Sequence, residues 1–106
     1  MKIIRTWKGW TLPENATAYQ LFLTEELFPS VKQKGVKGLE HVSISARSLP
    51  NEVEFFLTLR FDSIDSVKQF AGEQYEQAYI PNKAKSLLSR YDTKAEHFEL
   101  KEVFDL

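Results

Sequence analysis

The chain of 106 residues carries 14 basic and 15 acidic side chains, lacks cysteine, and is 42% hydrophobic. This length and apolar content predict one domain, residues 1–106, with a core of its own. A formal net charge of −1 supplies no long-range attraction for nucleic acid or an anionic membrane, so neither is an expected partner. The absence of cysteine excludes disulfides and thiolate chemistry, and with no apolar leader or span we expect a cytoplasmic protein.

A strand followed by a helix is predicted at the start of the chain. Residues 3–10 are rich in β-branched and aromatic side chains, which is typical of a strand. Thr11 and Glu14 stand at capping-box spacing around Pro13. The helix should therefore begin there, with Thr11 as its N-cap.

Apolar side chains recur along that helix at spacings of three and four, so they form one stripe that should pack on a sheet. The stripe consists of Ala16, Tyr19, Phe22, Leu23 and Leu27. Pro29 cannot donate a backbone hydrogen bond, which predicts a kink or break near Phe28. A further turn should end at Gly35 or Gly38.

Two alternating segments in the middle of the chain predict an antiparallel hairpin. Residues 39–49 and 52–61 flank a Ser-Leu-Pro-Asn turn at residues 48–51. In the second segment one apolar set occupies every other position, which assigns it to a core face. This set is Val53, Phe55, Leu57, Leu59 and Phe61.

The last third of the chain predicts two short helices and a strand. Residues 62–65 should start a helix that Gly72 ends, and Pro81 should open another through Leu88. Residues 95–104 alternate as a final strand, whereas residues 73–80 are ambiguous. The resulting βαββαβ order predicts an α+β, ferredoxin-like fold, a four-stranded antiparallel sheet with helices on one face.

Four stretches together cover most of the chain and resemble one known family. They are IIRTWKGWT at residues 3–11, EVEFFLTLRFDS at 52–63, VKQFAGEQYEQAYIPNKAKSLL at 67–88 and HFEL at 97–100. The family is that of the antibiotic biosynthesis monooxygenase-like proteins, in the dimeric α/β-barrel superfamily. The resemblance implies a homodimer in which two sheets pack face to face, and a pocket between sheet and helices in each protomer.

The resemblance also implies a choice of activities. Similar proteins include cofactor-independent oxygenases of polycyclic aromatic substrates, haem-degrading enzymes and members without assigned activity. Haem-degrading relatives hold iron through a histidine on a helix, whereas His41 and His97 fall on predicted strands. The two histidines also lack a third ligand at metal-binding spacing. We therefore expect no haem, no metal site and no other cofactor.

The polar face of the predicted sheet is the first candidate site. We assign Arg5 and Trp7 to it, and leave Ile4, Thr6 and Trp10 to the core. The other members are His41, Ser43, Ser45, Arg47, Glu54, Phe56, Thr58, Arg60, His97 and Glu99. Under a partner sheet, Arg60 would need Glu54, Glu99, water or a ligand as a counterpart. An ion-pair network at an interface is the structural alternative.

Within this set, His97 and Arg60 are the catalytic candidates, because a histidine can accept a proton near neutral pH. Candidates for gripping a flat aromatic ligand combine rings with polar tips. The ligand-binding candidates are Arg5, Trp7, His41, Phe56, Tyr75 and Tyr79. For Trp10 and Phe70 we prefer core packing.

Two functional hypotheses remain open. The first is a small monooxygenase-like enzyme that oxidises an aromatic or quinone-type molecule without a cofactor. The second is a non-enzymatic dimeric module, ligand-binding or stress-associated, whose polar face only specifies pairing. The second hypothesis predicts no cavity of ligand size inside the protomer. A pocket of several hundred cubic ångströms there would count against it.

Overall fold

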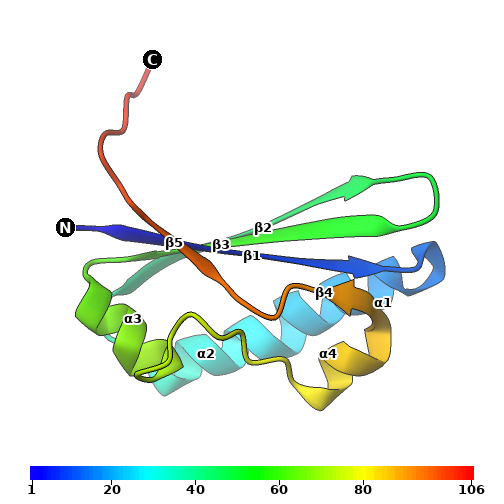
Figure 1. Ribbon diagram of the computed structural model, residues 1–106. Coiled ribbons are helices and arrows are strands. Elements are labelled where there is room, and N and C mark those ends of the chain that lie inside the picture. Colours follow the sequence, from blue (N-terminus) through cyan, green and yellow to red (C-terminus); the bar gives the residue numbers. More distant parts are fainter.

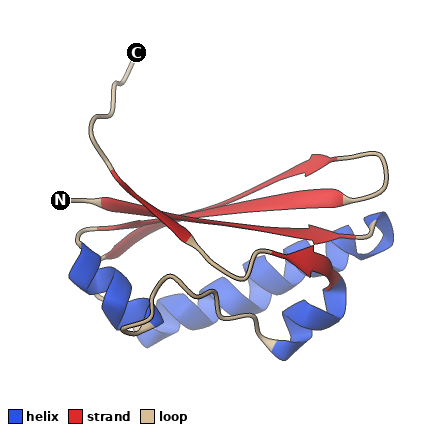
Figure 2. Cartoon of the chain, viewed as in Figure 1, coloured by secondary structure: helices blue, strands red, loops and turns tan.

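The computed structural model describes residues 1–106 and shows an α+β fold in two layers. An antiparallel sheet forms one layer, and all the helices pack against one of its faces, as Figures 1 and 2 show. This is the predicted ferredoxin-like architecture. None of the helices is both long and apolar enough to cross a membrane.

The sheet is built around its first strand, which has neighbours on both edges. Its strands are β1 (Ile3–Thr11), β2 (Leu39–Ser48), β3 (Val53–Phe61), β4 (Leu88–Tyr91) and β5 (Glu96–Glu99). Their order is β2-β3-β1-β4, with β5 also paired to β1. The predicted hairpin of β2 and β3 is confirmed, and so is the first strand.

The fourth position of the sheet is shared by two short strands. β4 pairs with the end of β1, whereas β5 pairs with its beginning. The predicted helix through Leu88 ends one residue early, because the backbone of Leu88 is already extended. The predicted strand over residues 95–104 is shorter than expected and is confined to β5. Beyond Leu100, whose N–H donates to the carbonyl of Lys2 at 2.9 Å, the chain leaves the sheet and projects away from it in Figure 1.

The first helical region differs from the predicted one at its start. Thr11 is the last residue of β1 and is fully buried, so its side chain caps no helix. Helical structure begins with a 3-10 turn, η1 (Pro13–Asn15), and continues as α1 (Ala16–Leu21). Proline in the first turn is confirmed, but the capping box is wrong because the strand extends through its first residue.

The predicted break before Pro29 takes the form of a wider helical turn. A π-helical segment, η2 (Phe22–Leu27), leads directly into α2 (Phe28–Lys34). A local change of helical hydrogen bonding accommodates the N–H that proline lacks. The helix ends at Gly35, which adopts φ +66°, as predicted.

The two later helices lie where the sequence places them. α3 (Ile64–Ala71) is capped by Ser63, whose hydroxyl accepts from the N–H of Ser66 at 3.2 Å. Gly72 follows its last turn. α4 (Asn82–Leu87) begins after Pro81.

The register between β1 and β3 decides which face of β1 meets the helices. Ile3 lies opposite Phe61, Arg5 opposite Leu59 and Trp7 opposite Leu57. Directly opposed residues on neighbouring strands point to the same side of a sheet. Since the β3 members of these pairs are core residues, all three β1 side chains face the helices.

The predicted faces of Arg5 and Trp7 are therefore wrong, and so are the core positions of Ile4, Thr6 and Trp10. Trp10 lies opposite Glu54 on the face without helices. Its indole N–H donates to the Glu54 carboxylate there at 3.1 Å. The sequence allowed Ile4, Thr6 and Trp10 to serve the core, but the register with β3 places Ile3, and with it Arg5, on the core side.

Gly38 should be the least replaceable glycine. It adopts φ +87°, and a Cβ on it would overlap the Ser66 hydroxyl and lie 2.5 Å from a carboxylate oxygen of Asp62. Gly35 also has a positive φ but has no atom within 4 Å of such a Cβ. We expect Gly35→Ala to lower the free energy of unfolding by about 1 kcal/mol, and Gly38→Ala by about 2–4 kcal/mol. Urea titration measures both, and equal losses would contradict the overlap.

Candidate functional site

A pocket of about 460 Å³ lies between the sheet and the helices. Its walls come from β1, β3, all four α-helices, η2 and the loop between α3 and α4, and 13 of its 17 lining residues are hydrophobic. Five aromatic side chains contribute to the wall. They are Trp7, Tyr19, Phe28, Phe70 and Tyr79. A second hollow of about 410 Å³ adjoins it and shares Val31, Lys34 and Phe70 with it.

Arg5 brings a buried positive charge to this apolar pocket. Only 6% of the residue is exposed, because its side chain lies on the face of the sheet that the helices cover. Its Nη1 donates to the carbonyl oxygen of Tyr75 at 2.5 Å and to Nε2 of His97 at 3.0 Å. The guanidinium carbon also lies 5.8 Å from the centre of the Phe70 ring. Burial lowers the pKa of Arg5, but a guanidinium stays protonated in proteins.

The remaining donors of Arg5 are free. Neither its Nε nor its Nη2 makes a hydrogen bond within the chain, and no carboxylate lies within ion-pair distance of the guanidinium. Its partners are a carbonyl, an imidazole and an aromatic ring, all of them neutral. The pocket therefore contains a cation whose charge the chain does not compensate.

His97 contacts the Arg5 guanidinium on the side away from the pocket. It lies opposite Arg5 in the β1–β5 ladder, and Tyr75 packs edge-on against its ring at 5.0 Å. Burial lowers the pKa of His97 and the charge of Arg5 adds to the effect, while Glu76 opposes it. The imidazole is thus neutral at pH 7, with Nε2 occupied as an acceptor. His97 is not among the lining residues of the pocket.

Tyr19 and Lys34 are two of the other polar residues that line the pocket. Tyr19 on α1 is almost fully buried, and its hydroxyl makes no hydrogen bond within the chain. Burial raises the pKa of this phenol, so it remains a hydrogen-bond donor. Lys34, at the end of α2, is the only charged lining residue besides Arg5. No carboxylate lines the pocket.

The loop between α3 and α4 closes one side of the pocket. Gln77 forms a bridge with Lys94, and the N–H of Ala78 donates to the carbonyl of Thr93 at 3.0 Å. Tyr79 at the rim is 85% exposed. The contact between Arg5 and the Tyr75 carbonyl ties the start of this loop to the sheet.

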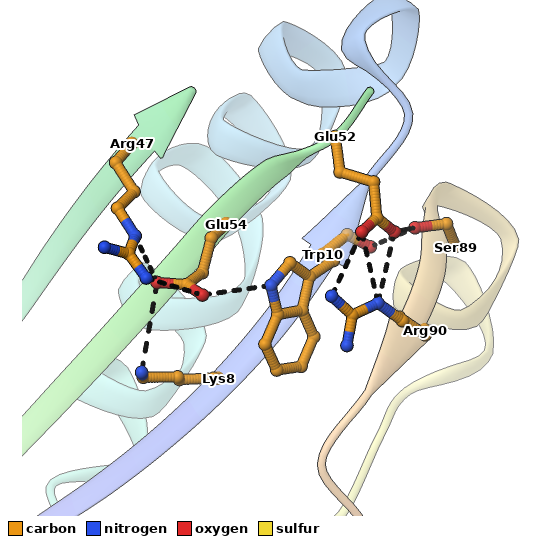
Figure 3. A network of polar contacts seen from close by, with 7 residues as sticks. All are labelled: Lys8, Trp10, Arg47, Glu52, Glu54, Ser89 and Arg90. Atoms are coloured by element: carbon orange, nitrogen blue, oxygen red, sulfur yellow. Dashed lines mark hydrogen bonds and ion pairs between the residues drawn. The ribbon is translucent and has the colours of Figure 1, made fainter. Parts of the chain in front are cut away.

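The opposite face of the sheet carries a compact polar network, drawn in Figure 3. Glu54, only 8% exposed, accepts hydrogen bonds from Arg47 at 2.7 Å and from Trp10 at 3.1 Å, with Lys8 at 3.9 Å. The Arg47 hydrogen bond is the main cause of the lowered pKa of Glu54. The Arg90 guanidinium lies 3.9 Å from the centre of the Trp10 ring. These charges compensate one another.

Arg60 is paired on this opposite face as well. It donates to Glu40 at 3.1 Å, and Glu40 also binds Lys2 at 2.6 Å. The expected partners Glu54 and Glu99 are not used: the bulge in β2 beside Arg60 brings in Glu40 instead. Arg60 therefore meets its need for a counter-charge within its own chain.

Five of the ligand-site and catalytic candidates lie at or behind the pocket. Arg5, Trp7 and Tyr79 line it. Tyr75 and His97 form the layer behind Arg5. The indole N–H of Trp7 donates to a loop carbonyl at 2.7 Å, which fixes the ring at the wall.

The other three candidates lie on the opposite face of the sheet. His41 is paired with Arg60 in the β2–β3 ladder, and Phe56 lies under the ammonium of Lys8 at 5.6 Å. His97 and Arg60 are thus on different faces, and the predicted grouping of His97 with the open-face residues is wrong. Their catalytic roles stay predictions.

Tyr19 and Lys34 were not predicted as site residues. Tyr19 appeared only as a member of the helical apolar stripe, although its polar tip distinguishes it from the other members. Lys34 stood among several lysines near a helix end, with no pattern to single it out. No group of three or more His, Cys, Asp or Glu side chains is arranged to hold a metal ion.

The fold is shared with solved structures at low sequence identity. A Bacillus cereus protein provisionally named an antibiotic biosynthesis monooxygenase matches with a TM-score of 0.69 and 11% identity, over 99% of this chain and 98% of that one. Rv0793 from Mycobacterium tuberculosis matches at 0.58 and 14%, over 99% and 98%. The de novo designed protein Foldit4 matches at 0.60 and 14%, over 95% and 100%.

These neighbours establish the fold, which this chain shares with a protein provisionally named an antibiotic biosynthesis monooxygenase and with Rv0793. No family model and no curated protein matches the sequence. Because a designed protein has the same architecture, the fold by itself carries no activity.

The lowered pKa of His97 should appear in the pH dependence of stability. Below the ordinary histidine pKa of about 6.5, the unfolded chain binds this proton before the folded chain does, so acidification costs stability. Between pH 7.5 and 5.5, we expect the free energy of unfolding of the unmodified protein to fall more than that of His97→Asn. Parallel curves for His97→Asn and the unmodified protein would contradict this assignment.

Proposed function

We propose that this protein binds a flat, mostly apolar small molecule in the pocket between sheet and helices. The pocket supports this, because its volume of about 460 Å³ falls within the range of about 300–1,000 Å³ typical of small-molecule sites. Its aromatic walls suit a planar ring system. A module whose polar face only specified pairing would need no such cavity.

We further propose that the bound molecule is oxidised by oxygen without a cofactor. In such a reaction a substrate carbon loses a proton, and the resulting anion adds to O2 with one electron pair to form a hydroperoxide. That carbon then loses its second hydrogen as a proton, and the electron pair of the C–H bond forms a C=O bond while the O–O bond breaks. One oxygen atom stays in the substrate and the other leaves as water. The likeness to a protein provisionally named a monooxygenase and the apolar pocket support this choice. Ligand binding without turnover is the alternative.

Oxygen uptake tests the proposed activity. With anthrone or a naphthohydroquinone as substrate, we expect uptake faster than in buffer or with heat-denatured protein. Ala78→Trp should reduce it at least about tenfold by filling the pocket, because a displaced substrate loses its reactive geometry. Ala18→Trp, on the exposed side of α1, is the matched control. Substrate binding without uptake would favour the non-enzymatic alternative.

We also propose that two copies of the chain pair through the face of the sheet that lacks helices. Register aligns Ser43, Thr58 and Thr6 in a row across this face. Ile4 and Phe98 are also opposed in the ladder, and Phe98 is 53% exposed. An uncovered sheet face with an apolar edge suits a second sheet.

Sedimentation tests this pairing. We expect a particle of about twice the chain mass of 12.3 kDa. Thr58→Arg should shift it toward the monomer, because it places two like charges in the centre of the interface. Thr17→Arg, on the exposed surface of α1, should leave the particle unchanged. A monomer for the unmodified chain would contradict the proposal.

A further inference from the structure

We propose that Arg5 binds an acidic oxygen of the pocket's ligand, so that the ligand is an aromatic acid. It would combine a flat apolar body with one carboxylate, phenolate or enolate oxygen. This inference rests on the proposed binding of a small molecule in the pocket, and adds the chemical class of that molecule.

The first argument is that Arg5 differs from every other arginine in the chain. The other three each pair with a glutamate. These pairs are Arg47 with Glu54, Arg60 with Glu40 and Arg90 with Glu52. Arg5 is the most buried of the four and has only neutral partners. A buried cation is costly unless an anion compensates it, and a ligand anion in the adjoining pocket would do so.

The second argument is the charge of the pocket wall. Among its 17 lining residues, Arg5 and Lys34 are positive and none is negative. The adjoining hollow is also lined without a carboxylate. A cationic ligand would meet only repulsion here, and a neutral one would leave Arg5 uncompensated.

The third argument is that the guanidinium is already oriented. Tyr75 and His97 hold Nη1 from behind, while Nε and Nη2 have no partner in the chain. These two nitrogens form one edge of the planar fork, the geometry that accepts two oxygens of a carboxylate. A held guanidinium loses little freedom when it binds an anion. The hydroxyl of Tyr19 offers another donor at the same pocket.

Matched ligands test the inference. The probes are 2-naphthoate and 2-naphthamide, which share a flat ring system and differ in charge, and titration calorimetry measures their affinities at pH 7. We expect the unmodified protein to bind the acid at least about tenfold more tightly than the amide, because charge-assisted hydrogen bonds are stronger. Arg5→Met should lose this preference but still bind the amide. Arg47→Met, which removes an arginine from the opposite face, should keep it.

The outcomes separate this inference from the proposed pocket. Equal affinities for acid and amide in the unmodified protein would overturn the role of Arg5 and leave the pocket standing. Binding of neither probe would overturn both. An acid preference that survives in folded Arg5→Met would also overturn the inference. If Arg5→Met does not fold, the ratio of the two affinities in the unmodified protein still decides.

Discussion

The pairing of β1 with strands on both of its edges is the constraint on which the rest of the structure depends. With β3 on one edge and β4 and β5 on the other, every side chain of β1 is committed to one of two faces. A shift of one residue in this register would exchange those faces. Arg5 and Trp7 would then leave the pocket, Ile3 would leave the core, and Trp10 would move to the helix face.

The two faces of the sheet differ in whether their arginines have a counter-charge, and the proposed ligand class rests on this difference. On the open face, Arg47, Arg60 and Arg90 each meet a glutamate of the same chain. On the helix face, Arg5 meets a carbonyl, an imidazole and a ring. Charges that are paired within the chain have a structural role and need no ligand. A buried charge without a counter-charge, next to a cavity, is instead a candidate site for binding an anion from outside the chain. The fold alone does not point to a binding site, since the designed protein Foldit4 has a similar fold.

The sequence predicted the fold well because periodicity is a local property. The alternation of Val53, Phe55, Leu57, Leu59 and Phe61 and the signals at Pro29, Gly35 and Gly72 each depend on a few neighbouring residues. The site was harder, because it depends on which face of β1 meets the helices. From the sequence, Ile4, Thr6 and Trp10 could serve the core, and this assigned Arg5 to the polar face. The partners that allow its burial, at Tyr75 and His97, lie 70 and 92 residues away and could not be paired with it from one sequence.

The same contacts connect the pocket with the loop that borders it. Nη1 of Arg5 holds the carbonyl of Tyr75 at the start of the loop, and His97 accepts from the same nitrogen while packing against the Tyr75 ring. Protonation of His97 would remove this acceptor and place a second cation beside the first. A neutral His97 is therefore a condition for the arrangement of both Arg5 and the loop. His97 thus holds the guanidinium in place, whereas the surface of the cavity is formed by other residues.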